Sequence, residues 1–232
     1  MSVGLAAVAV AVGAFAQSIS GIGFALVCGP FLVAILGVHQ GVRVAVLLSA
    51  LLNAGLMLRE LRMVRVRDGL RLLVPAVLAT PLLAYLLRRV DTRSAALAAG
   101  VATLFGVGVL ASGRRWPRAS GPTGAVLAGV LSASMNIVAA IGGPAAVLYA
   151  ENAGWRPTST RATLQAYFLV LNVVALASLG LPRLSWTFLA ALVVGSVAGA
   201  VVARRLPEAA VRRTTLGLAA FGGFVVIVRS LM

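Results

Sequence analysis

The dominant feature of this sequence is a series of apolar segments long enough to cross a lipid bilayer. A transmembrane helix needs about 20 mostly apolar residues. Uninterrupted segments of about this length cover residues 42–58, 70–87, 94–112, 162–181, 184–203 and 209–228. The chain is 61% hydrophobic and only 11% charged, whereas soluble domains carry about 25% charged residues. The sequence therefore predicts an all-α polytopic membrane protein.

Two further apolar regions, residues 3–38 and 122–153, are too long for one straight span and are interrupted by polar residues, glycine and proline. The interruptions fall at Ser18 to Gly23, Gly29-Pro30, Ser134 to Asn136, and Gly142-Gly143-Pro144. Each region precedes three ordinary spans. This order predicts an internal duplication, with a first membrane repeat at 1–116 and a second at 117–232.

Residues other than Leu, Ala and Val recur in the same order in both halves, which supports the duplication. The matched pairs lie 114 to 119 residues apart: Gly29-Pro30 with Gly143-Pro144, Gly37 with Gly154, Arg43 with Arg161, Asn53 with Asn172, Arg88-Arg89 with Arg204-Arg205, and Phe105-Gly106 with Phe221-Gly222.

The arginines indicate how the two repeats are oriented. All 20 basic residues are arginine, and they cluster between apolar segments, as expected of loops beside membrane spans rather than of a nucleic-acid surface. If each interrupted region crosses the membrane once, the two sides carry equal numbers of arginines. If each region enters and returns, the second repeat is inverted and the division becomes fourteen to six. Because cytoplasmic loops carry excess basic residues, we expect inverted repeats with both termini outside. Each repeat then has a broken helical segment or hairpin followed by three transmembrane helices.

The two interruptions predict the substrate site. Non-helical backbone at membrane depth is tolerated only where it is buried in protein or lines a cavity, and inverted-repeat transporters bind substrate at such breaks by alternating access. A helix that restarts at Pro30 or Pro144 directs free N–H groups and a partial positive charge at the gap, which suits an anion. The predicted substrate-binding residues are Gln17, Ser18, Ser20, Gly21, Gly23, Arg43, Asn53, Ser134, Asn136, Gly142, Gly143, Pro144, Arg161 and Asn172.

Some of these residues have a second interpretation. Asn53 and Asn172 are equally suited to tying neighbouring helices together, because an unbonded amide is costly in lipid. Arg43 and Arg161 lie near span ends and can extend to the interface.

Other functional classes fit the sequence less well. The sequence has one cysteine, Cys28, and one histidine, His39. These are too few for a metal site built from cysteine or histidine, and His39 is not placed to act as the base of an intramembrane serine protease. No cofactor is expected. We predict no enzymatic activity, no nucleic-acid partner and no metal. A passive small-anion channel or a non-transporting membrane scaffold subunit remains an alternative to a transporter.

Two motifs resemble a known family. The segments G-I-G-F-A-L-V-C-G-P-F-L and I-G-G-P-A-A-V-L-Y-A are similar to the paired motifs of TauE/SafE membrane transporters, and the resemblance covers essentially the whole chain. It implies a permease for a small anion, a sulfur oxyanion or an organosulfonate, in the inner (cell) membrane of a bacterium. A coupling proton or cation and assembly as a homodimer remain open.

Overall fold

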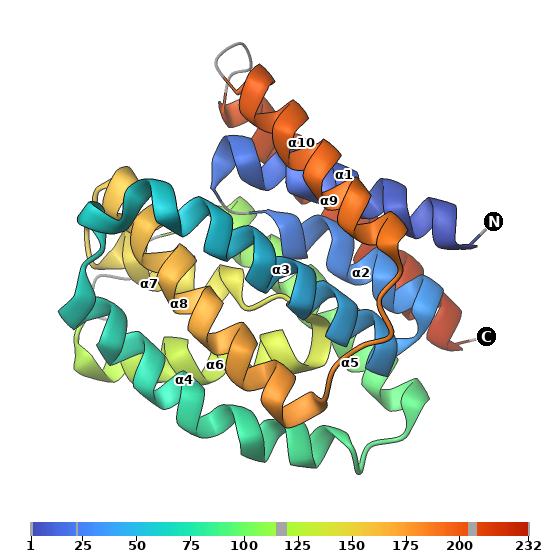
Figure 1. The fold of residues 1–232 in the computed structure, drawn as a ribbon. Coiled ribbons are helices and arrows are strands. Elements are labelled where there is room, and N and C mark those ends of the chain that lie inside the picture. Colours follow the sequence, from blue (N-terminus) through green and yellow to red (C-terminus); the bar gives the residue numbers. More distant parts are fainter. Residues whose placement is uncertain (1, 22, 115–119, 204–207, 232) are drawn as a thin grey trace.

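The computed structural model describes residues 2–21, 23–114, 120–203 and 208–231, which form ten α-helices, one short 3-10 helix and no strand (Figure 1). The first half contains α1 (Ser2–Ser20), α2 (Phe24–Leu36), α3 (Val38–Glu60), the 3-10 helix η1 (Leu61–Met63), α4 (Val66–Leu87) and α5 (Thr92–Ser112). The second half contains α6 (Pro122–Ala139), α7 (Gly143–Asn152), α8 (Pro157–Leu179), α9 (Trp186–Val202) and α10 (Glu208–Leu231).

Seven of the described helices are long and apolar enough to cross a membrane: α1, α3, α4, α5, α6, α8 and α10. Large apolar side chains on the outside of the bundle are exposed, as on α4, where Leu78 is 74% and Leu82 60% exposed. Such surface is stable in contact with lipid tails and unstable in water. The prediction of an all-α membrane protein is confirmed.

The first interrupted region forms a hairpin of two helices. The chain leaves α1 through Gly21, whose φ is 75°, and enters α2 after Gly23, whose φ is 155°. These conformations favour glycine because a side chain would clash with the backbone. Helix α2 then folds back along α1, so that a Cβ atom on Gly13 would lie 2.9 Å from the carbonyl oxygen of Phe24. With 13 residues, α2 is about 20 Å long and reaches only part of the way through a bilayer.

The second interrupted region has the same form. Helix α6 ends at Ala139, and Ala140 takes a left-handed conformation with φ of 59°. Helix α7 restarts at Gly143 and has ten residues, or about 15 Å. The Ser132 hydroxyl donates to the Gly142 carbonyl at 2.7 Å, which fixes the turn between the two helices.

Two of the predicted interruptions are wrong. Pro30 lies inside α2, where it packs against Gly222 of α10, and a membrane helix tolerates proline when neighbouring helices enclose it. Residues 134–136 continue α6, because the Ser134 hydroxyl bonds to Val130 of its own helix and Asn136 finds a partner on α8. The observed breaks agree with the other two predicted interruptions: one lies at Gly21 and Gly23, within Ser18 to Gly23, and the other at residues 140–142, which overlap Gly142-Gly143-Pro144.

The two halves interlock through equivalent contacts. Helix α1 packs on α9, and its counterpart α6 packs on α4. Both contacts are close: a Cβ atom on Gly195 would lie 2.2 Å from the Ala11 carbonyl oxygen, and one on Gly129 would lie 2.4 Å from that of Leu72. The pairs α3–α8 and α5–α10 complete the bundle.

The last helix of each half also supports the short helix of the other half. Gly106 of α5 lies against Pro144 of α7, and Gly222 of α10 lies against Pro30 of α2. The position of each short helix therefore depends on a glycine in the opposite half.

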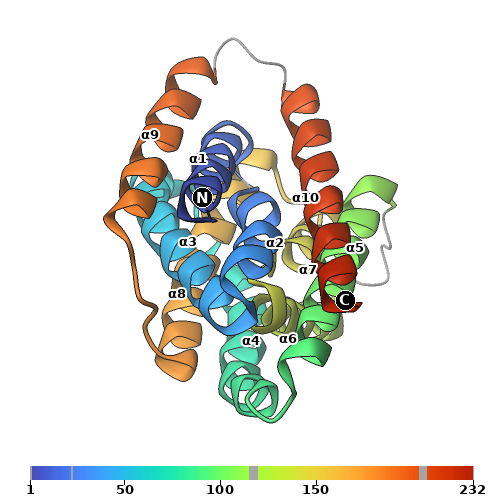
Figure 2. The same cartoon turned by 90° about the vertical axis from the view of Figure 1, so that its right-hand side faces the viewer.

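The chain connections lie at two ends of the bundle. At one end, α3 meets α8 through the Glu60–Arg161 ion pair, and Arg212 of α10 donates to the Leu110 carbonyl of α5 at 2.9 Å. The start of α1 and the end of α10 lie at the opposite end (Figure 1), which faces the viewer in Figure 2. At this end Arg93 donates to the Ser230 carbonyl at 2.8 Å. Four arginines of the predicted division lie outside the described residues: Arg115, Arg118, Arg204 and Arg205.

Candidate functional site

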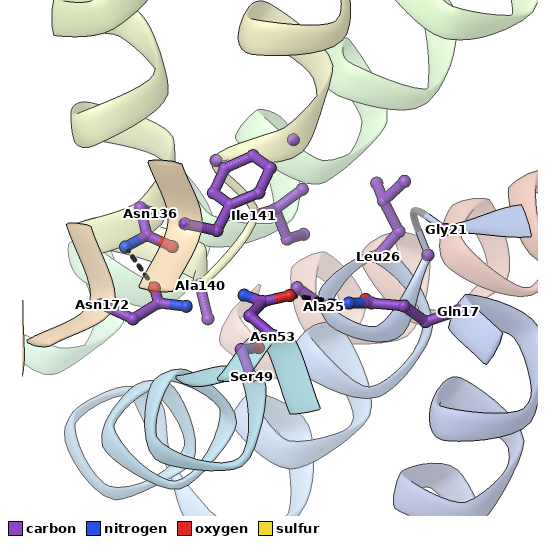
Figure 3. A pocket seen from close by; sticks show the side chains of 14 residues that line it. Gln17, Gly21, Ala25, Leu26, Ser49, Asn53, Asn136, Ala140, Ile141 and Asn172 are labelled. Atoms are coloured by element: carbon purple, nitrogen blue, oxygen red, sulfur yellow. Dashed lines mark hydrogen bonds between the residues drawn. The ribbon is translucent and has the colours of Figure 1, made fainter. Parts of the chain in front are cut away.

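The two breaks meet at a cavity of about 40 Å³ in the interior of the bundle (Figure 3). Helices α1, α2, α3, α6, α7 and α8 and the two breaks all contribute to its wall. The described lining residues are Gln17, Gly21, Gly23, Ala25, Leu26, Ser49, Asn53, Asn136, Ala140, Ile141, Gly142, Gly143, Phe168 and Asn172.

One wall is held by a side-chain amide at the end of α1. Gln17 Nε2 donates to Asn53 Oδ1 of α3 at 2.8 Å, and Gln17 Oε1 accepts the Phe24 backbone N–H at 3.0 Å. Both side chains are buried, at 6% and 3% exposure. A single glutamine therefore links the end of α1, the start of α2 and the middle of α3.

The second half repeats this arrangement. Asn136 Nδ2 of α6 donates to Asn172 Oδ1 of α8 at 3.0 Å. In both pairs the two residues are 36 positions apart, and each member of the first pair precedes its counterpart by 119 residues. The starts of α2 and α7, and those of α3 and α8, are also 119 residues apart. The two amide pairs thus occupy equivalent places in the two halves.

Three side-chain donors of the lining have no acceptor among the described residues. Asn53 and Asn172 each use the side-chain oxygen in the amide pair, and in Figure 3 both direct the Nδ2 atom towards the space between the pairs. The Ser49 hydroxyl, one helical turn before Asn53, is buried without a partner. These groups are donors available to a ligand in the cavity.

The electrostatic character of the cavity comes from neutral groups. Among the described residues, none that lines it is charged. The helix starts at Gly23 and Gly142 both reach the lining, and helix N-termini carry a partial positive charge. Uncharged donors combined with two helix N-termini suit a small anion.

The sulfite exporter TauE/SafE family matches residues 5–226, which include both hairpins and the whole cavity. The chain belongs to this family. The resemblance seen in the two motifs is confirmed, and this TauE/SafE protein is a membrane transporter of the sulfite or anion exporter type, not a member of an enzyme family. No curated protein and no solved structure matches the chain.

The predicted binding residues of this TauE/SafE chain divide into two groups. Those that line the cavity are Gln17, Gly21, Gly23, Asn53, Asn136, Gly142, Gly143 and Asn172. Those that are not part of its lining are Ser18, Ser20, Arg43, Ser134, Pro144 and Arg161. The hydroxyls of Ser18 and Ser20 donate to carbonyls one turn back in α1, at 2.9 and 2.8 Å, while Arg43 lies near the start of α3.

Arg161 lies next to the first break but outside the cavity lining. Its aliphatic carbons cover Gly21 so closely that a Cβ atom there would lie 2.6 Å from Arg161 Cδ. Its Nε lies 3.2 Å from Glu60 Oε1 of α3. Arg161 therefore packs against the break without lining the cavity.

Sequence reasoning missed Gln165, a buried residue one turn after Arg161 on α8. Gln165 Nε2 donates to the Gly21 carbonyl at 2.8 Å, and Gln165 Oε1 lies 3.5 Å from Gln17 Nε2. A glutamine in the interior of an apolar span was the available signal. Ser49 and Phe168 were also missed, although each precedes a predicted asparagine by one helical turn.

Proposed function

We propose that this TauE/SafE chain is a secondary transporter that carries a small sulfur oxyanion across the bacterial inner membrane by alternating access. The observation that carries the proposal is the presence of two equivalent amide pairs, Gln17–Asn53 and Asn136–Asn172, on the wall of one cavity. A binding site formed equally by two repeats can face each side of the membrane in turn when the repeats rock against each other.

We further propose that residues 1–116 and 117–232 are inverted repeats. The matching order of helices supports this assignment. So do the reciprocal contacts of Gly106 with Pro144 and of Gly222 with Pro30. Each half contributes one hairpin with its turn at the cavity.

The size of the cavity favours an oxyanion over a longer sulfonate. A volume of about 40 Å³ holds about three water molecules, which is comparable to a sulfur atom with three oxygens. The Nδ2 groups of Asn53 and Asn172 would donate to the oxygens from opposite repeats. Because the described lining has no cationic side chain, the neutral donors favour a monoanion over a dianion.

Counterflow in proteoliposomes tests the proposal. Liposomes loaded with unlabelled sulfite should accumulate labelled sulfite, and the rate should saturate with concentration. We expect Asn53→Leu and Asn172→Leu each to lower kcat/KM by at least about tenfold, since a hydrogen bond to a charged group contributes about 1.5–3 kcal/mol. Ser134→Ala is the matched control, because its hydroxyl bonds within α6.

Three results would contradict the proposal. Wild-type rates in both asparagine variants would remove the amide pairs from the binding site. A flux that rises without saturation and carries current would indicate a channel. The absence of flux for every sulfur oxyanion tried would indicate a scaffold subunit.

A further inference from the structure

A second cavity, of about 220 Å³, lies at the end of the molecule where α3 meets α8. One wall consists of Arg65, Asp68 and Arg71 at the start of α4, and the other includes Tyr149, Asn152 and Trp155 from α7 and the turn that follows it. These residues belong neither to the central cavity nor to the amide pairs.

The two arginines are held in place by one carboxylate. Arg65 Nε donates to Asp68 Oδ2 at 2.8 Å, and Arg65 Nη2 lies 2.8 Å from the same oxygen. Arg71 Nη1 lies 3.5 Å from Asp68 Oδ1. The Arg65 guanidinium also lies 5.6 Å from the centre of the Trp155 ring. Two guanidinium groups and one carboxylate give this wall a net charge of +1. Each guanidinium has five N–H donors in a planar fork, so donors remain for an anion after Asp68 is bound.

The cavity adjoins apolar surface on the same helix. The residues three, seven and eleven positions after Arg71 share its face of α4. They are Val74, Leu78 and Leu82, which are 52%, 74% and 60% exposed. Helix α6 packs closely against α4 and adds Val126 and Leu127, which are 48% and 67% exposed. The second cavity therefore lies at the start of α4, and exposed apolar side chains follow it along α4 and α6 towards the membrane interior.

We infer that this cavity binds the phosphate group of an acidic phospholipid, whose acyl chains lie along the exposed face of α4 and α6. A phosphodiester carries one negative charge, which complements the wall, and arginine binds phosphate oxygens through paired N–H groups. Basic pockets beside transmembrane helices are known to bind anionic headgroups. The combination of headgroup pocket and apolar track distinguishes a lipid from a free anion.

The same site has a structural link to the central cavity. Helix α7 begins at Gly143, which lines the central cavity, and its last turn contains Asn152, which lines the second. Because α7 has only ten residues, a headgroup bound at its end lies about 15 Å from the other cavity.

Lipid titration of the purified full chain tests the inference. Binding of phosphatidylglycerol and phosphatidylcholine is measured by native mass spectrometry, and thermal unfolding is followed with each lipid and with inorganic phosphate. We expect phosphatidylglycerol to bind and stabilise the protein more than phosphatidylcholine does. Arg65→Gln and Arg71→Gln should each weaken phosphatidylglycerol binding about fivefold.

Arg62→Gln is the matched control, because it removes the same charge from η1 at the same end without touching the cavity. It should leave phosphatidylglycerol affinity near the wild-type value. Equal binding of the two lipids, or an equal loss in Arg62→Gln and Arg71→Gln, would overturn the inference. Stabilisation by inorganic phosphate that matches phosphatidylglycerol would also overturn it, since the site would then bind a free oxyanion. Arg71 is exposed, and its one ion pair among the described residues is the 3.5 Å contact with Asp68. Arg71→Gln therefore tests the site even if Arg65→Gln does not fold.

Discussion

Replacing Gly106 or Gly222 by alanine should displace the short helices α7 and α2, which begin at the central cavity. A Cβ atom on Gly106 would lie 2.7 Å from Pro144 Cγ, and one on Gly222 would lie 2.9 Å from Pro30 Cβ. Because ordinary carbon contacts begin at 3.4 Å, each proline must move away by about 0.5–0.7 Å. Overpacking of this kind costs about 1–3 kcal/mol.

Part of this cost is offset by helix propensity, since alanine is favoured over glycine in a helix by up to about 1 kcal/mol. We therefore expect each variant to lose about 1–2 kcal/mol of stability. For a chain of this length, that corresponds to a decrease in Tm of about 2–8 °C. Counterflow should also slow, because Pro144 is the second residue of α7 and its displacement moves the helix start that lines the cavity.

The chain supplies a matched control for each variant. Gly108 lies on α5 with Gly106, and Gly217 lies on α10 with Gly222, and at both control positions a Cβ atom would have no neighbour within 4 Å. Gly108→Ala and Gly217→Ala should be as stable as wild type or slightly more stable. Thermal unfolding in detergent and counterflow in liposomes measure the two effects. If Gly106→Ala and Gly222→Ala behave like the controls, the short helices do not depend on these contacts and the reasoning is refuted.

Two further changes probe the first break and the start of α5. Gln165→Leu should lower stability by about 1–3 kcal/mol, because it leaves the buried Gly21 carbonyl without its donor; unchanged unfolding would show that this contact does not hold the break. At the other position, the Ser94 backbone N–H bonds to the Asp91 carboxylate at 2.9 Å and lowers its pKa. The lowered pKa means that Asp91 stabilises the folded chain at neutral pH and loses this contribution as pH falls below about 4. Tm measured against pH should therefore fall less steeply in acid for Asp91→Asn than for wild type, and parallel profiles would contradict the assignment.

The sequence predicted the all-helical membrane fold because the length of apolar segments is a strong signal in a membrane protein. It also located the region of the two breaks. Asn53 and Asn172 were identifiable because an amide inside an apolar span needs a partner or a ligand.

The exact positions of the breaks could not be predicted from local sequence. Ala140 is not a residue that ends helices, yet it takes a left-handed conformation in which its N–H bonds to the Asn136 carbonyl at 2.8 Å. Pro30 is a helix breaker in general, yet it lies within α2 because its surroundings in the bundle accept it. Both outcomes depend on packing between segments far apart in the chain.

The match of Gly29-Pro30 with Gly143-Pro144 does not give the register of the helix starts at the central cavity, because Pro30 lies inside α2 whereas Pro144 is the second residue of α7. It aligns the halves at 114 residues, whereas the helices around the cavity correspond at 119. At that spacing Gly21 corresponds to Ala140 and Gln17 to Asn136, although the residue types differ. At the central cavity, matching identical residue types therefore aligned the two halves less well than matching the helix starts and the hydrogen-bonded amide pairs.

The uncharged lining of the central cavity has a consequence for the energy source of transport. The described lining residues include no charged side chain. In the proposed alternating-access cycle, the empty site would therefore move no side-chain charge on reorientation, while the loaded site would move the charge of its anion. A membrane potential acts on that charge with about 2.3 kcal/mol per 100 mV. In a cell whose interior is negative, the voltage favours outward movement of the anion, and accumulation inside the cell would require coupling to a cation or to the exit of another anion.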